Sequence, residues 1–201
     1  IEADEEPPEE AGLDMIRDVP DADVPLVRPP SAKDRFTFEP AIPGSLADSL
    51  CYFLLATACR YVRGQSADHS SMLVHTTVYT HPHHALAEKI SDWKAKITAK
   101  LAKNDKAVLK RLEKLWHDET ARVDSSRFGL ATVSFAAVRE QLGQVLADIE
   151  IVVENSDSET RLDYTKGPKK YIVVGGSVLA RGLTIEGLVV SYFVRSSNQY
   201  D

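Results

Sequence analysis

A glycine-rich stretch near the end of the chain, GGSVLARGLTIEG, has the composition of a turn that contacts phosphate. Gly175 and Gly176 follow a strongly apolar run, and they let the backbone bend where a side chain would collide. In a parallel α/β sheet, ligands bind at the carboxyl end of such a run, where Ser177, Arg181 and exposed backbone amides can face a phosphate. The competing interpretation is an ordinary tight turn with Arg181 as a surface charge, and the residues themselves leave both open.

Two other groups of residues raise the question of a metal site. Four of the six histidines lie between His75 and His84, and imidazole is a good zinc ligand, but no cysteine or acidic residue within that segment completes a ligand set. The acidic residues between Asp148 and Lys166 lack the Glu-x-Lys spacing of a metal-dependent nuclease core. We therefore predict no metal site, and a solvated acidic loop over 155–163.

The sequence has no phosphate-binding loop of the Gly-x-x-x-x-Gly-Lys-Ser/Thr type, no Gly-x-Ser-x-Gly nucleophile turn and no Gly-x-Gly-x-x-Gly dinucleotide motif. Phosphoryl transfer needs groups that cradle the β- and γ-phosphates. We therefore predict that this chain alone does not hydrolyse ATP and contains no catalytic residue.

The pattern of apolar residues predicts an α/β fold with a parallel sheet flanked by helices. Runs that are apolar throughout, such as 172–174 and 188–194, predict strands covered on both faces. Ser45 and Asp48 are spaced as a capping box at the start of a buried helix. The predicted strands are 71–80, which is expected to be central, 149–156, 169–176 and 188–195, and the predicted helices are 45–63, 85–103, 106–123 and 134–149.

Charge and proline divide the chain into regions. Ten acidic residues against one arginine precede residue 24, and prolines recur up to residue 43, so 1–43 is predicted to be an acidic, proline-rich linker. Residues 44–201 are predicted to form one domain, with a helical hairpin insertion at 85–123. The lysines of that hairpin could follow a phosphate backbone, whereas Trp93 and Trp116 are expected inside its core.

No stretch approaches the roughly 18 consecutive apolar residues that a membrane span requires, so no membrane partner is expected. The two cysteines, Cys51 and Cys59, would lie about 12 Å apart along one helix, which is too far for a disulfide. A reducing compartment and a cytoplasmic location follow as expectations.

Three stretches together resemble the Z1 domain family. They are the glycine-rich stretch with the VSYFVRSSNQYD that follows it, IPGSLADSLCYFLLATACRYVRG, and SSMLVHTTVYTHPHH. The family is described as endonucleases and is associated with superfamily-two helicase-like ATPases. The resemblance therefore implies the second RecA-like lobe of such a helicase, truncated after Asp201 before an arginine-containing helix.

The same resemblance implies the site residues. ARGLTIEG is similar to the helicase segment that touches the nucleotide ribose and the nucleic-acid backbone, although Thr184 stands where an aspartate is typical. The implied nucleotide contacts are Gly175, Gly176, Arg181, Gly182, Thr184 and Glu186. The implied nucleic-acid contacts are His75, Thr76, Ser177 and Arg195.

The partners implied by the resemblance are DNA and, through a first lobe outside this chain, ATP. ATP and Mg²⁺ are implied only for the full-length protein, which would act in restriction, defence or DNA repair, with a defence-system protein as a further partner. The alternative is a non-catalytic protein-interaction module on a degenerate helicase fold.

Overall fold

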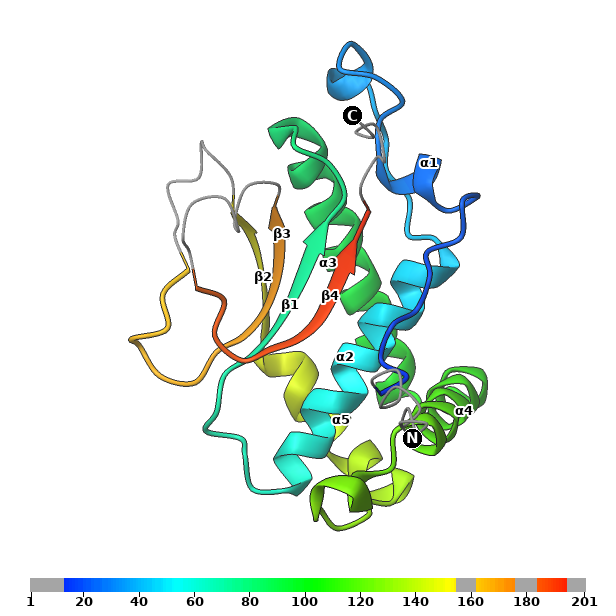
Figure 1. Cartoon of the computed structure of the whole chain (residues 1–201), viewed down its shortest axis with the longest axis vertical. Coiled ribbons are helices and arrows are strands. Elements are labelled where there is room, and N and C mark those ends of the chain that lie inside the picture. Colours follow the sequence, from blue (N-terminus) through cyan, green and yellow to red (C-terminus); the bar gives the residue numbers. More distant parts are fainter. Residues whose placement is uncertain (1–12, 155–161, 176–183, 195–201) are drawn as a thin grey trace, which may run out of the picture.

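The computed structural model describes residues 13–154, 162–175 and 184–194 (Figure 1). The helices are α1 (Val24–Val27), α2 (Gly44–Val62), α3 (Thr80–Ala102), α4 (Lys106–Arg122) and α5 (Phe135–Asp148), with two short 3₁₀ helices, η1 (Asp34–Phe36) and η2 (Ser125–Phe128). The strands are β1 (Ser70–His75), β2 (Ile149–Glu154), β3 (Lys170–Gly175) and β4 (Leu188–Phe193).

The four strands form one sheet in the order β2-β3-β1-β4, and every neighbouring pair is parallel. The parallel sheet flanked by helices and the central position of β1 are therefore confirmed. Parallel strands require crossover connections, and the one from β1 to β2, which are separated in the sheet by β3, contains α3, α4 and α5.

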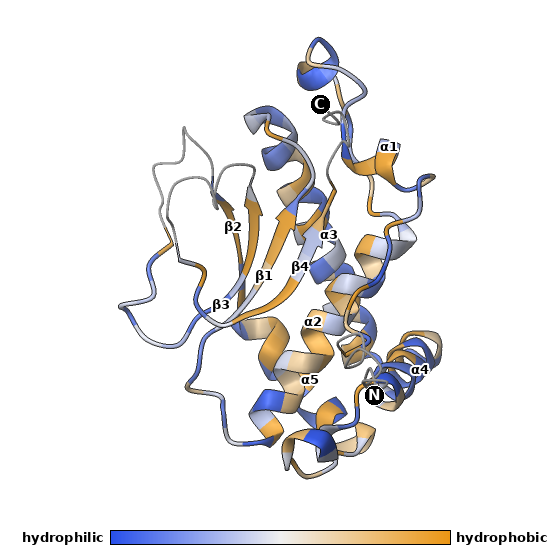
Figure 2. Ribbon diagram, in the orientation of Figure 1, coloured by the Kyte–Doolittle hydropathy of each residue, from blue (hydrophilic) through white to orange (hydrophobic). Residues whose placement is uncertain are grey.

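Helices cover one face of the sheet. Because side chains alternate along a strand, Met72 and Val74 of β1 share this face with Ile172 and Val174 of β3, and all four belong to the main hydrophobic core. Helix α3 packs against β2 and β3, α2 against β4, and α5 against α2. Figure 2 shows that the strands and the sides of the helices that meet them are predominantly apolar.

The opposite face is covered, among the described residues, by loop segments and not by helices. A second, smaller apolar cluster lies there, in which Leu73, Tyr171 and Val173 pack against Leu162, Tyr164 and Ile185. The prediction that 172–174 is buried on both faces is confirmed, but the same prediction for β4 is wrong. Leu188 is 47% exposed and Phe193 43% exposed, because β4 is an edge strand that these loop segments leave partly uncovered.

The predicted strand 71–80 ends earlier than expected. Strand β1 stops at His75, and α3 begins at Thr80, so the HPHH segment lies in the first turns of a helix and does not merely end a strand. Pro82 is compatible with this position because the first amides of a helix have no intrahelical acceptor. The start of α3 thereby lies beside the end of β1.

The predicted capping box at the start of α2 is wrong. The Ser45 hydroxyl lies 2.9 Å from the Tyr192 hydroxyl, and Asp48 accepts a hydrogen bond from Arg111 at 2.6 Å. The cap comes instead from the preceding connector, where the Asp23 carboxylate accepts a hydrogen bond from the Ser45 amide at 3.1 Å. Side chains that cap a helix from 22 residues away leave no local sequence pattern.

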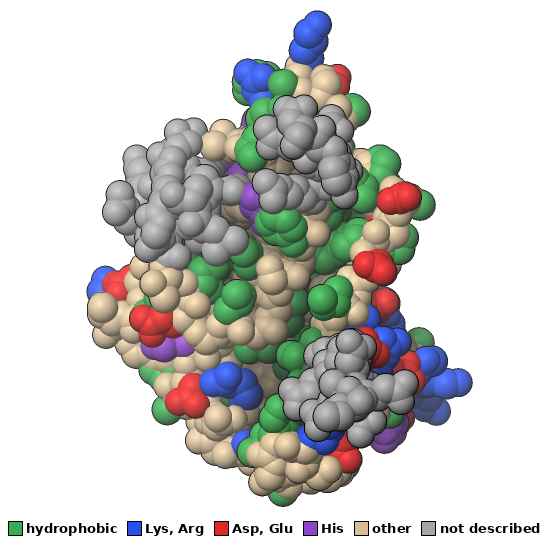
Figure 3. Space-filling model, viewed as in Figure 1, with side chains coloured by type: hydrophobic (Ala, Val, Ile, Leu, Met, Phe, Trp, Pro, Cys, Tyr) green, Lys and Arg blue, Asp and Glu red, His purple; other side chains and the backbone are tan. Residues whose placement is uncertain are grey.

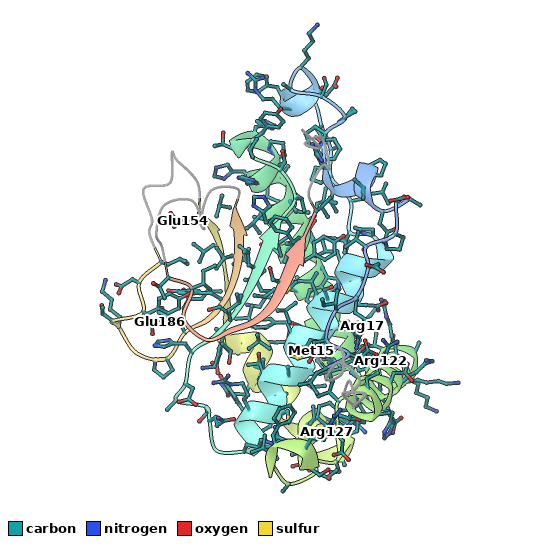
Figure 4. The ribbon with its side chains drawn as sticks, in the orientation of Figure 1. Met15, Arg17, Arg122, Arg127, Glu154 and Glu186 are labelled. Atoms are coloured by element: carbon teal, nitrogen blue, oxygen red, sulfur yellow. The ribbon has the colours of Figure 1, made fainter. Side chains whose placement is uncertain are left out.

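The connector that precedes α2 is held on the helices by core packing and by ion pairs. Val27 is 1% exposed and belongs to the main core. Arg17 donates to Glu119 of α4 at 2.6 Å, and Asp14 lies 3.4 Å from Arg122 of the same helix (Figure 4). The acidic residues 1–12 lie outside the described residues, so the linker boundaries stay a prediction.

The two predicted helices of the hairpin are present, but they pack on different elements. Helix α3 belongs to the layer that covers the sheet, whereas α4 packs against α2 through Leu112 and Trp116. Trp116 is 9% exposed and Trp93 is partly buried against the same core, which confirms that both tryptophans are core residues. The insertion boundaries at 85 and 123 stay a prediction.

Candidate ligand site at the carboxyl end of the sheet

The last residues of the four strands form one row across the sheet. The strand register places Glu154 beside Gly175 and His75 beside Phe193, with β3 and β1 adjacent in the middle. These residues point away from the helices, since Ile149, Ile151 and Val153 of β2, and Met72 and Val74 of β1, point toward them. We call this row the carboxyl end of the sheet, which is where parallel α/β sheets bind ligands.

His75 is held in a fixed orientation within this row. Its Nδ1 lies 2.9 Å from the Gly175 carbonyl, which can only accept, so Nδ1 carries the hydrogen and donates it. The ring stacks on Phe193, with the centroids 4.7 Å apart and the planes at 11°. The two rings thus form a flat aromatic pair beside the backbone of β3.

The turn between β1 and α3 adds the start of a long helix to the same end of the sheet. Thr76 and Thr77 are buried, and Thr77 Oγ1 accepts a hydrogen bond at 3.3 Å from the amide of Tyr79, the N-cap residue of α3. Among the described residues, no side chain caps the next two amides, those of Thr80 and His81. Uncapped amides and the helix dipole make such an N-terminus attractive to anions. This end of the sheet therefore combines an aromatic surface with hydrogen-bond donors suited to phosphate.

A buried histidine holds this turn in place. His83 is 1% exposed, and its Nε2–H donates to the Thr77 carbonyl at 2.9 Å. Within residues 13–154, 162–175 and 184–194, its Nδ1 has no hydrogen-bond partner. Burial lowers the pKa of His83, so the side chain is neutral in the folded protein.

We expect His83 to make the free energy of unfolding depend on pH. The folded-state pKa lies below the unfolded value of about 6.5, so the unfolded chain takes up the proton first as pH falls. Stability should be fully present above that value and decrease below it, by at most about 1.4 kcal/mol per pH unit for this one group. Urea unfolding of His83→Gln across this range should show a weaker dependence than wild type, because glutamine can still donate to Thr77 but does not gain the charge.

The same change at the exposed His117 of α4 is the matched control and should keep the wild-type dependence. Equal pH dependence in wild type and His83→Gln would contradict the assignment.

The structure brings together three of the predicted site residues. Gly175, His75 and Thr76 all lie at the carboxyl end of the sheet. Five predicted site residues lie outside the described residues, namely Gly176, Ser177, Arg181, Gly182 and Arg195.

Glu186 is not brought to this end of the sheet, and Thr184 is an exposed residue two positions before it in the chain. The Glu186 carbonyl accepts a hydrogen bond from the Ser71 hydroxyl at 2.8 Å, and its carboxylate lies 3.5 Å from His69 Nε2, at the amino end of β1. Ser71 precedes His75 by four residues, which corresponds to about 13 Å along a strand. Figure 4 likewise shows Glu186 and Glu154 at different ends of the sheet.

Glu154 is a residue of this end that the sequence prediction did not select. It ends β2, it is 5% exposed, and its Oε2 has no hydrogen-bond partner among the described residues. The sequence places it directly before the predicted acidic loop, which suggested solvent exposure. The signal that distinguishes it is its position as the last residue of a buried strand, because the register then sets it beside Gly175.

The other acidic residues considered for a nuclease core are engaged elsewhere. Asp148 accepts from the Tyr61 hydroxyl at 2.6 Å, Glu150 pairs with Lys169 at 2.8 Å, and Lys166 pairs with Asp163 at 3.1 Å. In the described ranges, no three His, Cys, Asp or Glu side chains are grouped as metal ligands would be.

Exposed lysines follow the turn between α3 and α4. Lys103, Lys106 and Lys110 are exposed, whereas Lys114 is paired with Asp118. Figure 3 shows basic side chains on the side of the molecule where α4 lies, with acidic side chains among them. This surface is a candidate for nucleic-acid contact that is separate from the carboxyl end of the sheet.

Two expectations concern disulfide formation within α2 and the ability of the helices to span a membrane. Cys51 and Cys59 are buried free thiols, which confirms that they form no disulfide, and burial raises the pKa of Cys51 to about 11. Of the helices in the described parts of the chain, none has the length and apolar character needed to cross a membrane.

Comparison with known proteins identifies the family. A family model, the Z1 domain, matches residues 45–201. No curated protein and no solved structure matches the chain. The matched region contains all four strands and every helix from α3 onward, together with nearly all of α2. The chain therefore belongs to the Z1 domain family.

Proposed function

We propose that this chain is the second RecA-like lobe of a DNA-acting, superfamily-two helicase-like ATPase in restriction, defence or DNA repair. The observation that carries the proposal is the convergence of the His75 ring, the uncapped start of α3 and Gly175 at one end of a parallel sheet. Gly175 is the residue from which the glycine-rich stretch continues toward Arg181. Ligand binding at this end agrees with the general behaviour of parallel α/β sheets.

The residues at the carboxyl end of the sheet are better suited to binding a nucleotide than to binding the Mg²⁺ ion that accompanies it. The uncapped amides of α3 suit a phosphate, and the flat surface of His75 and Phe193 suits a base or a sugar. Among the described residues, this end of the sheet offers a single carboxylate, Glu154, whereas Mg²⁺ prefers several oxygen ligands. ATP, when bound, supplies the phosphoanhydride whose hydrolysis drives the movement of DNA. We propose that the Mg²⁺ ligands come from the remainder of the ATPase.

DNA binding is the direct test of this proposal. Fluorescence anisotropy with labelled duplex and single-stranded DNA, repeated over a salt series, should show affinity that falls with salt in the wild type. Arg181→Ala should weaken binding to all sequences alike and reduce the slope of log K against log salt by about 1, because one phosphate contact is lost.

Arg127→Ala is the matched control, since Arg127 is an exposed arginine on η2, away from the carboxyl end of the sheet (Figure 4). It removes the same charge and should leave the slope unchanged. A second arm reverses Lys106 and Lys110 to glutamate, which tests the lysine surface independently. If the wild type does not bind DNA, the proposal fails and the interaction-module alternative remains; equal losses in Arg181→Ala and Arg127→Ala would also contradict it.

A further inference from the structure

Glu154 is buried and, among the described residues, one of its carboxylate oxygens has no hydrogen-bond donor. The residue is 5% exposed, and its Oε2 accepts no hydrogen bond from the part of the chain that the structure describes. A buried carboxylate oxygen without a donor is unfavourable, because that oxygen loses hydration and gains no hydrogen bond in return. Each buried polar group that stays unpaired in a native structure calls for an explanation, and a bound ligand is one of the accepted ones.

The strand register gives the neighbours of Glu154 along the carboxyl end of the sheet. Val152 precedes it on the same face, and Gly175 lies beside it in register and has no side chain. His75 is the next residue across the sheet, on β1. Two strand spacings separate Glu154 from His75, which corresponds to about 10 Å between their backbones. A ligand lying over Gly175 would thus have a carboxylate on one side and the imidazole ring, backed by Phe193, on the other.

Because Glu154 offers a carboxylate, its ligand must present chemical groups that a carboxylate can bind. An ionised carboxylate only accepts hydrogen bonds, so its ligand must donate them. The backbone of DNA offers no donor, whereas the ribose of a nucleotide offers two adjacent hydroxyl groups. A metal ion would find no second carboxylate or cysteine beside Glu154 among the described residues. A ribose diol therefore fits Glu154 better than a DNA backbone or a bare cation does.

We infer that Glu154 accepts hydrogen bonds from the ribose hydroxyls of a nucleotide bound at the carboxyl end of the sheet. This inference rests on the proposed function and names the acidic residue of its nucleotide site. The resemblance would have located the ribose contact near Thr184, where the usual aspartate is absent. The nearby acid, Glu186, lies at the amino end of β1 beside His69. Glu154 supplies a carboxylate at the end of the sheet where Gly175 and His75 lie.

Calorimetric titration of the whole chain with ATP and with 2′,3′-dideoxy-ATP tests the inference. Wild type should prefer ATP by roughly ten-fold to a hundred-fold, which is the usual value of hydrogen bonds to a charged group. Glu154→Gln preserves the shape of the side chain but removes its charge, and it should lose most of this preference by binding ATP more weakly.

Glu150→Gln is the matched control on the same strand, because Glu150 is exposed and paired with Lys169. It should keep the wild-type preference. If Glu154→Gln discriminates between the two nucleotides as well as wild type does, the inference is wrong while the proposed function stands. If wild type binds neither nucleotide at millimolar concentrations, the inference and the ATP half of the proposed function both fail, and the anisotropy experiment decides the DNA half separately.

Discussion

Replacing Gly187 by alanine should destabilise the folded chain by about 3 kcal/mol or more. Gly187 has φ +63°, and a Cβ atom at this position would lie 2.1 Å from the His69 carbonyl oxygen and 2.5 Å from its carbon. These neighbours are backbone atoms at the entry to β1, so they cannot move away as a flexible side chain can. The Gly187 carbonyl also accepts a hydrogen bond from the Ser71 amide, which ties the start of β4 to β1. The alanine variant should therefore show a much lower midpoint in urea unfolding.

Gly129→Ala is the matched control for this experiment. Gly129 has nearly the same φ, +66°, but a Cβ there would meet nothing within 4 Å. Alanine at Gly129 should cost only the backbone strain, about 1 to 2 kcal/mol. The difference in the free energy of unfolding between the two alanine variants measures the steric clash at Gly187 alone. Equal urea midpoints for the two variants would show that β1 and β4 separate easily at this point.

Truncating Phe53 to alanine should cost about 3 to 5 kcal/mol. Phe53 is 0% exposed and lies in the middle of α2, within the core that joins the helices to the sheet. Removing the ring loses its buried surface and leaves a cavity that rigid neighbours fill only in part. For a domain of ordinary stability this is a large fraction of the total, so the unfolding midpoint in urea should fall sharply.

Phe128→Ala is the comparison that isolates burial. It removes the same ring from η2, where Phe128 is 55% exposed, and should change the free energy of unfolding by less than about 1 kcal/mol. Comparable losses in the two variants would mean that the interior near Phe53 is loosely packed.

The apolar pattern was sufficient to predict the class of fold. The fully apolar segment at 172–174 and the β-branched segment of β1 indicated strands buried in a parallel sheet, and both are present with that direction. Trp93 and Trp116 were placed in the core by their helical spacing. These predictions succeed because burial acts on every residue of a strand or helix, so the pattern repeats many times within one element.

Features that depend on contacts between distant residues could not be predicted. The Asp23 cap on α2 and the position of Glu186 beside His69 arise from three-dimensional proximity, which no local spacing encodes. The end of β1 at His75 was missed for a related reason, because Val78 and Thr80 are β-branched and therefore looked like a continuation of the strand. Glu154 fell within the predicted strand 149–156, but its burial follows from its register beside Gly175, which no local spacing encodes.

Because Asp23 caps α2, the folded unit begins earlier in the chain than the family match does. The family match begins at residue 45, the residue whose amide Asp23 binds, and Val27 of the same connector is buried in the core. The stretch that matches the family is therefore shorter than the stretch that packs into the core. A recombinant fragment trimmed to the family border would expose the first turn of α2 and open a gap in the interior, so any excision of this module should keep the chain from at least residue 23.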